Sequence, residues 1–567
     1  MSTSGNASPS IQEIRAKCQE VFGCKPFLWQ CRALEATLKG SDVIIDVGTG
    51  AGKTLAFFLP LLFRPSGIQI IVTALNILGQ QNVETLQRAR VTAISISAEC
   101  ATAQNFQDIA DGRYRVVVVN PEQLMKPNGG FEKLFRNEGF VSQISSIVFD
   151  EAHCISQWGT FRPEYKQVSR LRYLLPSTPF VFASATFSPL ILEDIKQTLH
   201  LRNENLTHIR LPNDRPNISL GVRQMKYAVS SFLDLIFLIP QSWKEGDPPP
   251  KKFVVFFDSI AESVQAGRFL RRRLPLEQRK KIRWLHSNMS EPFKKQTVEQ
   301  LKNGEIWGIC ATDSFGMGMD LPDIALIVNW KILCSMCTLW QRLGRGARDR
   351  DLTATTYVFV EKKYIDSERE KAAKRKAARE QTKKRKRTET RDEEPAQKWR
   401  RVGDTGLATR VSVQAETETP EIDEGNVVDN VDPAALQELM EWDFDDESDA
   451  EEPEERVSWP TEERVLGVML DLSMCLEDRL EVRRALYHEQ EKGRNSKAVV
   501  KKRGVVSLPP ELDDFVNADE RKLGCRRVPI KAYFGSTRAG ESCVTHACSR
   551  SLRSPHDVNS HDDTLRM

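Results

Sequence analysis

The sequence predicts an α/β protein in which two parallel-sheet domains of similar construction lie in tandem and a largely disordered, charged C-terminal region follows. Short β-branched apolar runs alternate with longer amphipathic stretches from Ile44 to Ala185, which is typical of βα units on a parallel sheet. A second series of the same kind begins at Lys252 and continues to Val360. At 567 residues the chain also exceeds what one core usually organises, so at least two domains are expected.

Buried strands are expected in both series because each run is short, apolar and rich in β-branched residues. The connector Leu211–Ser219 carries Pro212 and Pro216, which disfavour helix and suit a hinge. We therefore assign residues 10–210 to the first domain and 211–361 to the second. The expected strands are Asp42–Asp46, Ile68–Thr73, Tyr114–Asn120, Ser146–Asp150 and Pro179–Ser184 in the first series, and Lys252–Asp258, Ile306–Thr312, Ile324–Trp330 and Thr355–Val360 in the second.

Charge divides the rest of the chain into segments. The net charge is only +3, but Lys362–Arg401 is dominated by Lys and Arg, and Glu416–Glu455 by Asp and Glu. We expect residues 362–401 to form a basic arm and residues 402–460 to hold too few apolar side chains to become ordered. An amphipathic stretch predicts one helix within 461–493, and 494–567 gives little signal.

Neither the apolar runs nor the cysteines indicate a membrane or an oxidising compartment. The longest apolar runs, such as Phe57–Phe63, are too short to cross a bilayer, and Met1–Ser10 lacks the layout of a signal peptide. The 12 cysteines show no disulfide-scaffold spacing, so we expect an intracellular protein with reduced thiols and no membrane partner. The group Cys543, His546 and Cys548 does not match a standard zinc pattern.

The first expected strand runs into a glycine-rich loop, and a helical pattern follows it. Glycines let successive backbone N–H groups wrap a phosphate, and the helix N-terminus adds its positive end. We expect Lys53 to neutralise β- and γ-phosphate charge and Thr54 to hold Mg²⁺. The predicted nucleotide contacts are Thr49, Gly50, Ala51, Gly52, Lys53 and Thr54.

A magnesium nucleotide needs a second carboxylate at the end of a neighbouring strand, and the run Ile147–His153 supplies one. Asp150 is expected to contact Mg²⁺ through water, and Glu151 to act as general base toward the attacking water. Taken alone, such an acidic pair is often only the cap of a helix.

Charge that develops on a transferred phosphate calls for arginine, and the second domain offers the segment Gln341–Asp349. Arg345 and Arg348 lie three positions apart, so on a helix they point from one face toward a single phosphate site. A solvated basic face is the alternative interpretation. The predicted catalytic residues are Lys53, Asp150, Glu151, Gln341, Arg345 and Arg348.

These segments, with Ser184–Thr186, resemble in type and order the motifs of superfamily 2 helicases. The run Cys154–Tyr165, directly after the acidic box, looks like the aromatic-rich loop of RecQ-type DNA helicases. The resemblance implies two tandem RecA-like P-loop NTPase domains, with ATP and Mg²⁺ as cofactors.

The resemblance also implies roles for individual residues. Trp158 and Phe161 would stack on unpaired bases while Arg162 reaches phosphate, and ordinary packing of the aromatic rings is the alternative. Gln30 resembles the adenine-reading residue, and Asp320 is implied near the ribose or the arginines. The implied nucleic-acid contacts are Asn120, Pro121, Glu122, Trp158, Phe161, Arg162 and Thr312.

The function expected from the resemblance is an ATP-dependent 3′–5′ DNA helicase that acts on single-stranded DNA and duplex junctions in recombination or repair. However, no cysteine occurs between Cys337 and Cys475, so the zinc-binding region that often follows in RecQ proteins is missing, and no segment resembles a winged helix. A non-unwinding translocase or binding scaffold therefore stays open. An RNA helicase does too, because the acidic box reads Asp-Glu-Ala-His.

The charged tails indicate further partners. The clusters Lys374–Lys376 and Lys383–Arg387 predict a nuclear import signal or a phosphate-binding arm, with a solvated helix as the alternative. The acidic segment 416–455 contains Trp442 and Phe444, a composition seen in regions that bind protein partners. We expect a nuclear protein.

Overall fold

The computed structural model describes residues 8–389 apart from 160, 161, 241, 242, 245, 316–320 and 350, together with residues 462–465, 468–471, 476–496 and 508–535 apart from 522 and 524. The predictions for Phe161, Asp320, the acidic segment within 402–460 and the Cys543–Cys548 group lie outside these residues. The chain divides into one compact unit of residues 1–374 and 473–567 and a second unit of residues 375–472.

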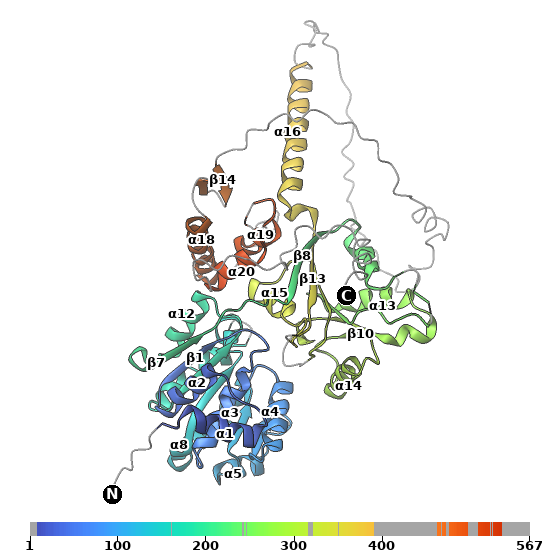
Figure 1. Ribbon diagram of the computed structural model, residues 1–567. Helices are drawn as coiled ribbons and strands as arrows, with labels where there is room; N and C mark the ends of the chain where they lie inside the picture. Colours follow the sequence, from blue (N-terminus) through green and yellow to red (C-terminus); the bar gives the residue numbers. More distant parts are fainter. Residues whose placement is uncertain are drawn as a thin grey trace, which may run out of the picture. The chain divides into compact units, whose positions relative to one another are not determined.

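The first domain contains a seven-stranded, fully parallel sheet in the order β3-β4-β2-β5-β6-β1-β7 (Figure 1). All five strands expected here are confirmed, and β3 and β7 are additional. The strands are β1 Asp42–Asp46, β2 Ile68–Val72, β3 Ala93–Ile96, β4 Val116–Val119, β5 Ile144–Asp150, β6 Phe180–Ser184 and β7 Leu206–Arg210.

Helices cover both faces of this sheet, which explains why its strands are continuous apolar runs. Val43 and Ile45 of β1 belong to a core with Phe57, whereas Ile44 between them belongs to the core on the opposite face. The helices are α1 Ile11–Phe22, α2 Leu28–Leu38, α3 Lys53–Phe63, α4 Asn76–Arg88, α5 Ala103–Ala110, α6 Pro121–Leu124, α7 Gly130–Phe135, α8 Glu138–Gln143, α9 His153–Gln157, α10 Glu164–Gln167, α11 Arg170–Leu174 and α12 Pro189–Thr198, with the 3-10 turn η1 Asn203–Asn205.

The second domain repeats this design with a six-stranded parallel sheet in the order β10-β11-β9-β12-β13-β8. The four expected strands are confirmed, and β8 and β10 are additional. The elements are β8 Ile218–Gln224, η2 Val229–Ser231, η3 Leu233–Leu238, β9 Phe253–Phe256, α13 Ile260–Arg272, η4 Leu276–Lys281, β10 Ile282–Leu285, α14 Glu291–Lys302, β11 Gly308–Ala311, η5 Asp313–Phe315, β12 Leu326–Trp330, α15 Met336–Leu343, β13 Ala354–Val360 and η6 Lys362–Tyr364.

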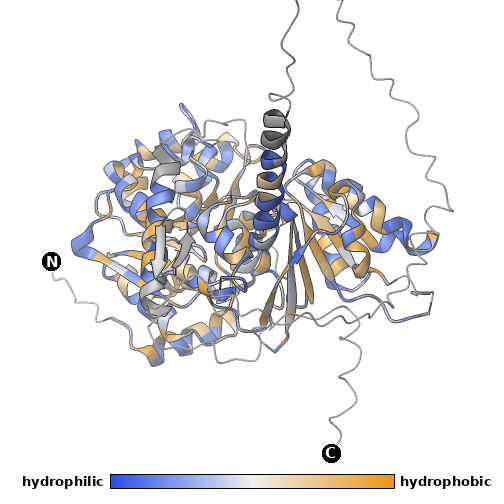
Figure 2. Cartoon of the chain, turned by 90° about the horizontal axis from the view of Figure 1, so that it is seen from above, coloured by the Kyte–Doolittle hydropathy of each residue, from blue (hydrophilic) through white to orange (hydrophobic). Residues whose placement is uncertain are grey.

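Past the second sheet, α16 spans Asp366–Glu389 and is exposed throughout residues 370–382. It is mostly blue in Figure 2, in keeping with a hydrophilic helix. The expected helix within 461–493 is only partly right, since Glu462–Val465 (β14) pairs with Val468–Asp471 (β15) before α18 begins at Leu476.

Three helices of the C-terminal region belong to the first compact unit, and the sequence signalled only the first of them. They are α18 Leu476–Ser496, α19 Pro510–Val516 and α20 Arg527–Phe534. Leu512, Phe515 and Phe534 are each 0% exposed, and they join the same core as the sheets. Within the described part of the chain, no helix is both long enough and apolar enough to span a lipid bilayer.

Asp42 anchors the start of β1 through a buried charge cluster. It is 0% exposed, and its carboxylate lies 2.9 Å from Arg172 Nη2 and 3.0 Å from Arg202 Nη2. The Phe180 N–H donates to the same carboxylate at 2.9 Å, which ties β1 to β6. The carboxylate thus supports the strand that leads to the glycine-rich loop.

We predict that Asp42→Ala lowers the free energy of unfolding of the first domain by about 3 kcal/mol, because two arginines lose their buried partner. Urea unfolding followed by tryptophan fluorescence measures this. Glu35→Ala is the matched control, since the Lys39–Glu35 pair is exposed, and it should change stability by less than about 0.5 kcal/mol. Equal effects of the two substitutions would contradict the role given to Asp42.

Candidate functional site

The glycine-rich loop connects the carboxyl end of β1 to the N-terminus of α3. Gly50 and Gly52 adopt φ values of +76° and +82°, a left-handed conformation that favours glycine and turns the loop N–H groups inward. Lys53, the first residue of α3, donates from Nζ to the carbonyl oxygens of Val47 at 3.1 Å and Gly48 at 3.2 Å. The loop therefore turns back so that the Lys53 ammonium group meets the backbone at its beginning.

Gln30 of α2 contacts this loop directly. It is 1% exposed, its Nε2 donates to the Gly52 carbonyl at 2.8 Å, and its Oε1 accepts from the Phe27 N–H at 2.7 Å. A glutamine amide carries two N–H donors and two acceptor lone pairs, so one donor and one acceptor remain for a ligand. That remainder is what pairing with an adenine edge requires.

The acidic pair stands where β5 ends, and in the sheet order β5 lies between β2 and β6, with β1 on the far side of β6. Burial, followed by the neighbouring Glu151 charge, raises the pKa of Asp150. Burial acts in the same direction on Glu151, but its hydrogen bond to His153 and the charges of Lys53 and Arg345 lower the pKa of Glu151 overall. Glu151 is therefore the carboxylate that stays ionised.

The oxygen donors at this point fit a magnesium ion. Asp150 is a buried carboxylate whose ionised form is penalised, and a nearby cation would relieve that penalty. Thr54 supplies a hydroxyl in the first turn of α3. Carboxylate and hydroxyl oxygens suit Mg²⁺, which is usually held by few protein groups and by phosphate.

Residues of the second domain reach the same site from α15 and the loop after it. Gln341 Nε2 lies 3.0 Å from His153 Nε2 and 3.1 Å from Thr186 Oγ1. Arg345 is only 4% exposed. Burial lowers the pKa of Lys53 most, and the positive charges of Arg348 and Arg345 lower it further, so both arginines lie within electrostatic range of the ammonium group.

Close packing between the two domains supports this geometry. A Cβ atom placed on Gly344 would lie 2.7 Å from Thr49 Oγ1, so a larger residue would displace the Thr49 side chain. Here the loop after α15 that carries Arg345 and Arg348, the arginine-bearing loop, packs closely against the glycine-rich loop. The predicted catalytic residues Lys53, Asp150, Glu151, Gln341, Arg345 and Arg348 are thus brought together from both domains, although they span almost 300 positions of the chain.

His153 connects Gln341 to Glu151. Donation from the Gln341 amide to His153 Nε2 leaves the imidazole proton on Nδ1, given the amide orientation in the structure. His153 Nδ1 lies 2.8 Å from Ser184 Oγ and 3.3 Å from Glu151 Oε2. The position of α15 is therefore linked through two hydrogen-bonding groups to the candidate general base.

The candidate nucleic-acid residues of the first domain gather just after the acidic box. The Arg162 guanidinium lies 5.2 Å from the Trp158 ring centroid and pairs with both oxygens of Glu122, at 2.5 Å and 2.7 Å. Trp158 packs edge-on against Tyr165, with ring centroids 6.2 Å apart. Arg162 is therefore paired with a carboxylate and stacked on two aromatic rings.

The remaining candidates occupy separate positions. Asn120 caps α6 by accepting from the Gln123 N–H at 2.8 Å, and Pro121 is the first residue of that helix. Thr312 follows β11 in the second domain. Its N–H donates to the Leu285 carbonyl at 3.2 Å.

Sequence patterns did not single out Asp46, Arg210 or Arg215. Asp46 ends β1, is 1% exposed and lies 3.2 Å from Arg210 Nε. Burial raises the pKa of Asp46 to about 7, although Arg210 and Lys53 counteract it. Arg215 donates to three carbonyl groups of the arginine-bearing loop. Only an acidic residue closing an apolar strand was visible in the sequence, and neither arginine lies in a motif.

Comparison with known proteins identifies two domain families. The DEAD/DEAH box helicase family matches residues 28–195, and the helicase conserved C-terminal domain matches residues 239–350. A solved structure of the DEAD-box helicase Mss116, bound to ssRNA and UDP-BeF, shares the fold with a TM-score of 0.52 and 17% identity over 63% of this chain and 74% of that one.

Curated relatives are RecQ-type helicases. The chain is 28% identical to the mouse ATP-dependent DNA helicase Q5 over 352 residues, which cover 60% of the chain and 35% of the relative. It is 27% identical to the ATP-dependent DNA helicase RecQ of Haemophilus influenzae, covering 62% of the chain and 55% of the relative. It is also 27% identical to the ATP-dependent helicase SGS1 of Saccharomyces cerevisiae, and this match covers 61% of the chain and 24% of the relative.

The chain thus spans only about a quarter to about half the length of these three relatives. These matches run over 352, 366 and 361 residues, which is about the length of the two parallel-sheet domains together. The chain therefore carries the two helicase domains, and over them it is similar to RecQ-like helicases of superfamily 2.

Proposed function

We propose that this protein is an ATP-dependent DNA helicase of RecQ type that moves 3′ to 5′ along single-stranded DNA and separates duplexes during recombination or repair. The observation that supports this proposal best is the composite site, in which Gln341 of the second domain lies 3.0 Å from His153 Nε2 beside the acidic pair, and Gly344 packs against Thr49 of the glycine-rich loop. A nucleotide bound there would link the relative position of the domains to its own hydrolysis.

In the proposed reaction the loop Thr49–Thr54 and the ammonium group of Lys53 hold the triphosphate, and Gln30 reads the adenine. Thr54 and Asp150 hold Mg²⁺, which neutralises phosphate charge. Glu151 takes a proton from the attacking water. Gln341, Arg345 and Arg348 of the second domain complete the proposed ATP site. Asp320 is proposed to lie near the ribose or near these arginines.

Arg345 and Arg348 have a specific task in this scheme. Negative charge on the γ-phosphate increases toward the transition state, and guanidinium groups in a site with little water stabilise it strongly. Because these groups come from the second domain, the chemistry proceeds only when the two domains are closed. Loss of the γ-phosphate removes the attraction and permits reopening.

The DNA strand is proposed to contact residues close to the acidic box. Trp158 and Phe161 stack on bases, and Arg162 exchanges part of its pairing with Glu122 for a backbone phosphate. Asn120, Pro121 and Thr312 are proposed to lie along the same strand. This arrangement would connect strand binding to Asp150 and Glu151 through one short helix, α9.

A second candidate function is a translocase or scaffold that does not unwind. It is favoured by one feature of the sequence, the lack of any cysteine between Cys337 and Cys475, because strand separation in many RecQ proteins relies on the region that follows a zinc site. We also propose that the clusters Lys374–Lys376 and Lys383–Arg387 direct nuclear import and that the acidic segment 416–455 binds protein partners.

An unwinding assay with forked DNA separates these functions. Release of the strand from a fork with a 3′ tail, and not from one with a 5′ tail, is the result expected of the helicase. ATP hydrolysis stimulated by single-stranded DNA without strand release would instead establish a translocase or scaffold. Greater stimulation by RNA than by DNA oligonucleotides would identify an RNA helicase.

We predict that Lys53→Ala and Glu151→Gln separate nucleotide binding from hydrolysis. Loss of the Lys53 charge should weaken ATP binding about tenfold or more, because a charge-assisted phosphate contact is lost. Glu151→Gln should leave ATP affinity near the wild-type value and lower kcat about 100-fold or more, because the general base is removed. Fluorescent-nucleotide titration and a phosphate-release assay measure the two effects.

Glu35→Gln, at the exposed pair on α2, is the matched control for the glutamate substitution and should match the wild type in both assays. Wild-type turnover in Glu151→Gln would exclude this residue as the base. Full hydrolysis by Lys53→Ala would exclude the glycine-rich loop as the site of triphosphate binding.

We predict that Trp158→Ala uncouples the motor from DNA. Loss of base stacking should weaken single-stranded DNA binding about tenfold or more and reduce the stimulation of ATP hydrolysis, while basal hydrolysis persists. Fluorescence anisotropy and ATPase titrations with oligonucleotides measure this. Tyr173→Ala, at an aromatic residue of the same domain that is 71% exposed, should have no effect. Unchanged DNA stimulation in Trp158→Ala would assign the indole to packing alone.

A further inference from the structure

The loop that carries the two catalytic arginines is held by the connector between the domains. The Arg215 guanidinium donates to the carbonyl oxygens of Gly344 at 3.2 Å, Gly346 at 3.1 Å and Ala347 at 2.7 Å. Asn217 Nδ2 adds a bond to the Ala347 carbonyl at 2.8 Å. These carbonyls follow the C-terminus of α15, where no helical partner is available to them.

The bonds to Arg215 and Asn217 hold a strained backbone. Ala347 has a φ of +39°, and a left-handed conformation at a non-glycine residue costs about 1–2 kcal/mol unless its surroundings impose it. Arg345 and Arg348 lie in the chain on either side of Gly346 and Ala347, two of the three residues whose carbonyls accept from Arg215. The direction of both guanidinium groups therefore depends on where the connector lies.

The connector is held in turn by α20, a helix near the end of the described chain. Arg527, the first residue of α20, donates to Asp214 Oδ1 at 2.5 Å, to the Arg215 carbonyl at 3.0 Å and to the Ile218 carbonyl. Arg527 is 5% exposed, so its charge is neutralised by this contact rather than by water. Lys531, one turn later, lies 3.4 Å from Asp214.

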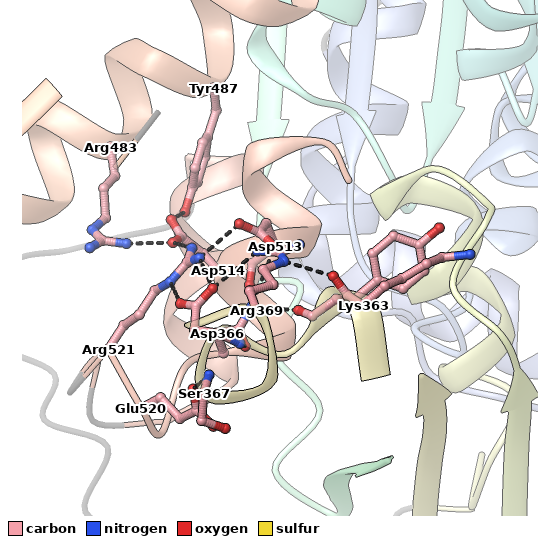
Figure 3. Close-up of polar contacts among 12 residues, drawn as sticks. Lys363, Asp366, Ser367, Arg369, Arg483, Tyr487, Asp513, Asp514, Glu520 and Arg521 are labelled. Carbon is pink, nitrogen blue, oxygen red and sulfur yellow. Dashed lines mark hydrogen bonds and ion pairs between the residues drawn. The ribbon is translucent and has the colours of Figure 1, made fainter. Parts of the chain in front are cut away.

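A buried charge cluster fixes the neighbouring helix α19 to the end of the second domain (Figure 3). Arg521 lies 2.6 Å from Asp366, 2.7 Å from Asp513 and 2.7 Å from Asp514. Asp514 also pairs with Arg483 of α18 at 2.6 Å, and both side chains are 0% exposed. Charges buried to this degree need defined partners, so the C-terminal helices have one preferred packing arrangement.

α20 also touches α15 itself. Tyr533 Oη lies 3.7 Å from Cys337 Sγ on α15 and donates to Glu491 on α18 at 2.8 Å. Cys337 Sγ in turn lies 3.5 Å from the Thr186 carbonyl of the first domain. The C-terminal helices thus contact both segments that flank the arginine-bearing loop, namely the connector and the start of α15.

We propose that Arg527 is a positioning residue for ATP hydrolysis. It touches no nucleotide, but by fixing Asp214–Ile218 it sets Arg215, and Arg215 sets the loop that presents Arg345 and Arg348. The C-terminal helices therefore contribute to ATP hydrolysis by positioning the two arginines. The inference rests on the proposed function, because it requires Arg345 and Arg348 to act on a bound triphosphate.

The test uses the full chain and compares Arg527→Ala, Arg527→Lys and Arg526→Ala in DNA-stimulated ATP hydrolysis. Arg527→Ala is expected to lower kcat about tenfold and to change KM for ATP less than about twofold, because small displacements of a transition-state group act on kcat. Arg527→Lys should restore part of the loss. Arg526→Ala breaks only an ion pair with Asp519 inside the C-terminal region and should match the wild type.

A binding measurement separates positioning from a loss of folding. Arg527→Ala should bind ADP as the wild type does and bind ADP with beryllium fluoride about tenfold more weakly, because only the phosphate mimic engages the arginines. Asp214→Asn gives a second route if Arg527→Ala does not fold. It leaves Arg527 in place and should lower kcat in the same direction.

Double substitution identifies the path of the effect. If Arg527 acts through Arg345 and Arg348, then adding Arg527→Ala to Arg345→Ala/Arg348→Ala should cause no further loss of kcat. This inference alone would be overturned if the losses of kcat multiplied when the substitutions were combined. It would also be overturned if Arg527→Ala and Asp214→Asn both kept the wild-type kcat while Arg345→Ala was impaired. Wild-type turnover in Arg345→Ala would instead overturn the proposed role of the arginines.

Discussion

The charged groups between the two domains can be buried only because opposite charges meet there and hydrogen bonds fix their geometry. Lys53, Asp150 and Glu151 come from the first domain, and Arg345 and Gln341 come from the second. An unpaired ion at this depth would cost several kcal/mol, so neither half of the site is stable in this form without the other. The closed arrangement and the catalytic chemistry therefore have the same physical basis.

This constraint explains why hydrogen bonds and ion pairs around the site form chains that link distant elements to its carboxylates. His153 bridges Gln341 and Glu151, so a shift of α15 reaches the base directly. Arg162 binds Glu122 and the Ala74 carbonyl at 2.9 Å, and it follows the acidic box by only a few residues. Movement of a DNA strand against this loop would be transmitted to the carboxylates through α9.

The sequence predicted the two parallel sheets well because their strands are buried on both faces and read as unbroken β-branched runs. The residues proposed for phosphate binding could also be picked out from the sequence, since phosphate binding requires glycine, lysine and hydroxyl groups in one local order. The strands β3, β7, β8 and β10 were missed, because they are shorter, more polar or less buried, as the exposed residues of β7 illustrate. Their existence depends on neighbours supplied by the rest of the fold.

The part of the site that escaped sequence reasoning is held by long-range contacts. Arg215 and Arg527 lie in no motif, and most of their partners are backbone carbonyls, which leave no trace in residue identity. Helices α19 and α20 have only eight residues or fewer, too short for a clear periodic pattern. Their stability comes from charge pairs and burial against both domains, which composition alone does not reveal.

The most direct test of this account is a crystal structure of the protein with Mg²⁺, ADP and aluminium fluoride, which mimics the phosphoryl group in the transition state of hydrolysis. We expect the nucleotide between the two domains, with the guanidinium groups of Arg345 and Arg348 within hydrogen-bonding distance of the fluoroaluminate and Lys53 on its opposite side. A nucleotide bound to the first domain alone, with both arginines directed into solvent, would contradict the composite site on which the account depends.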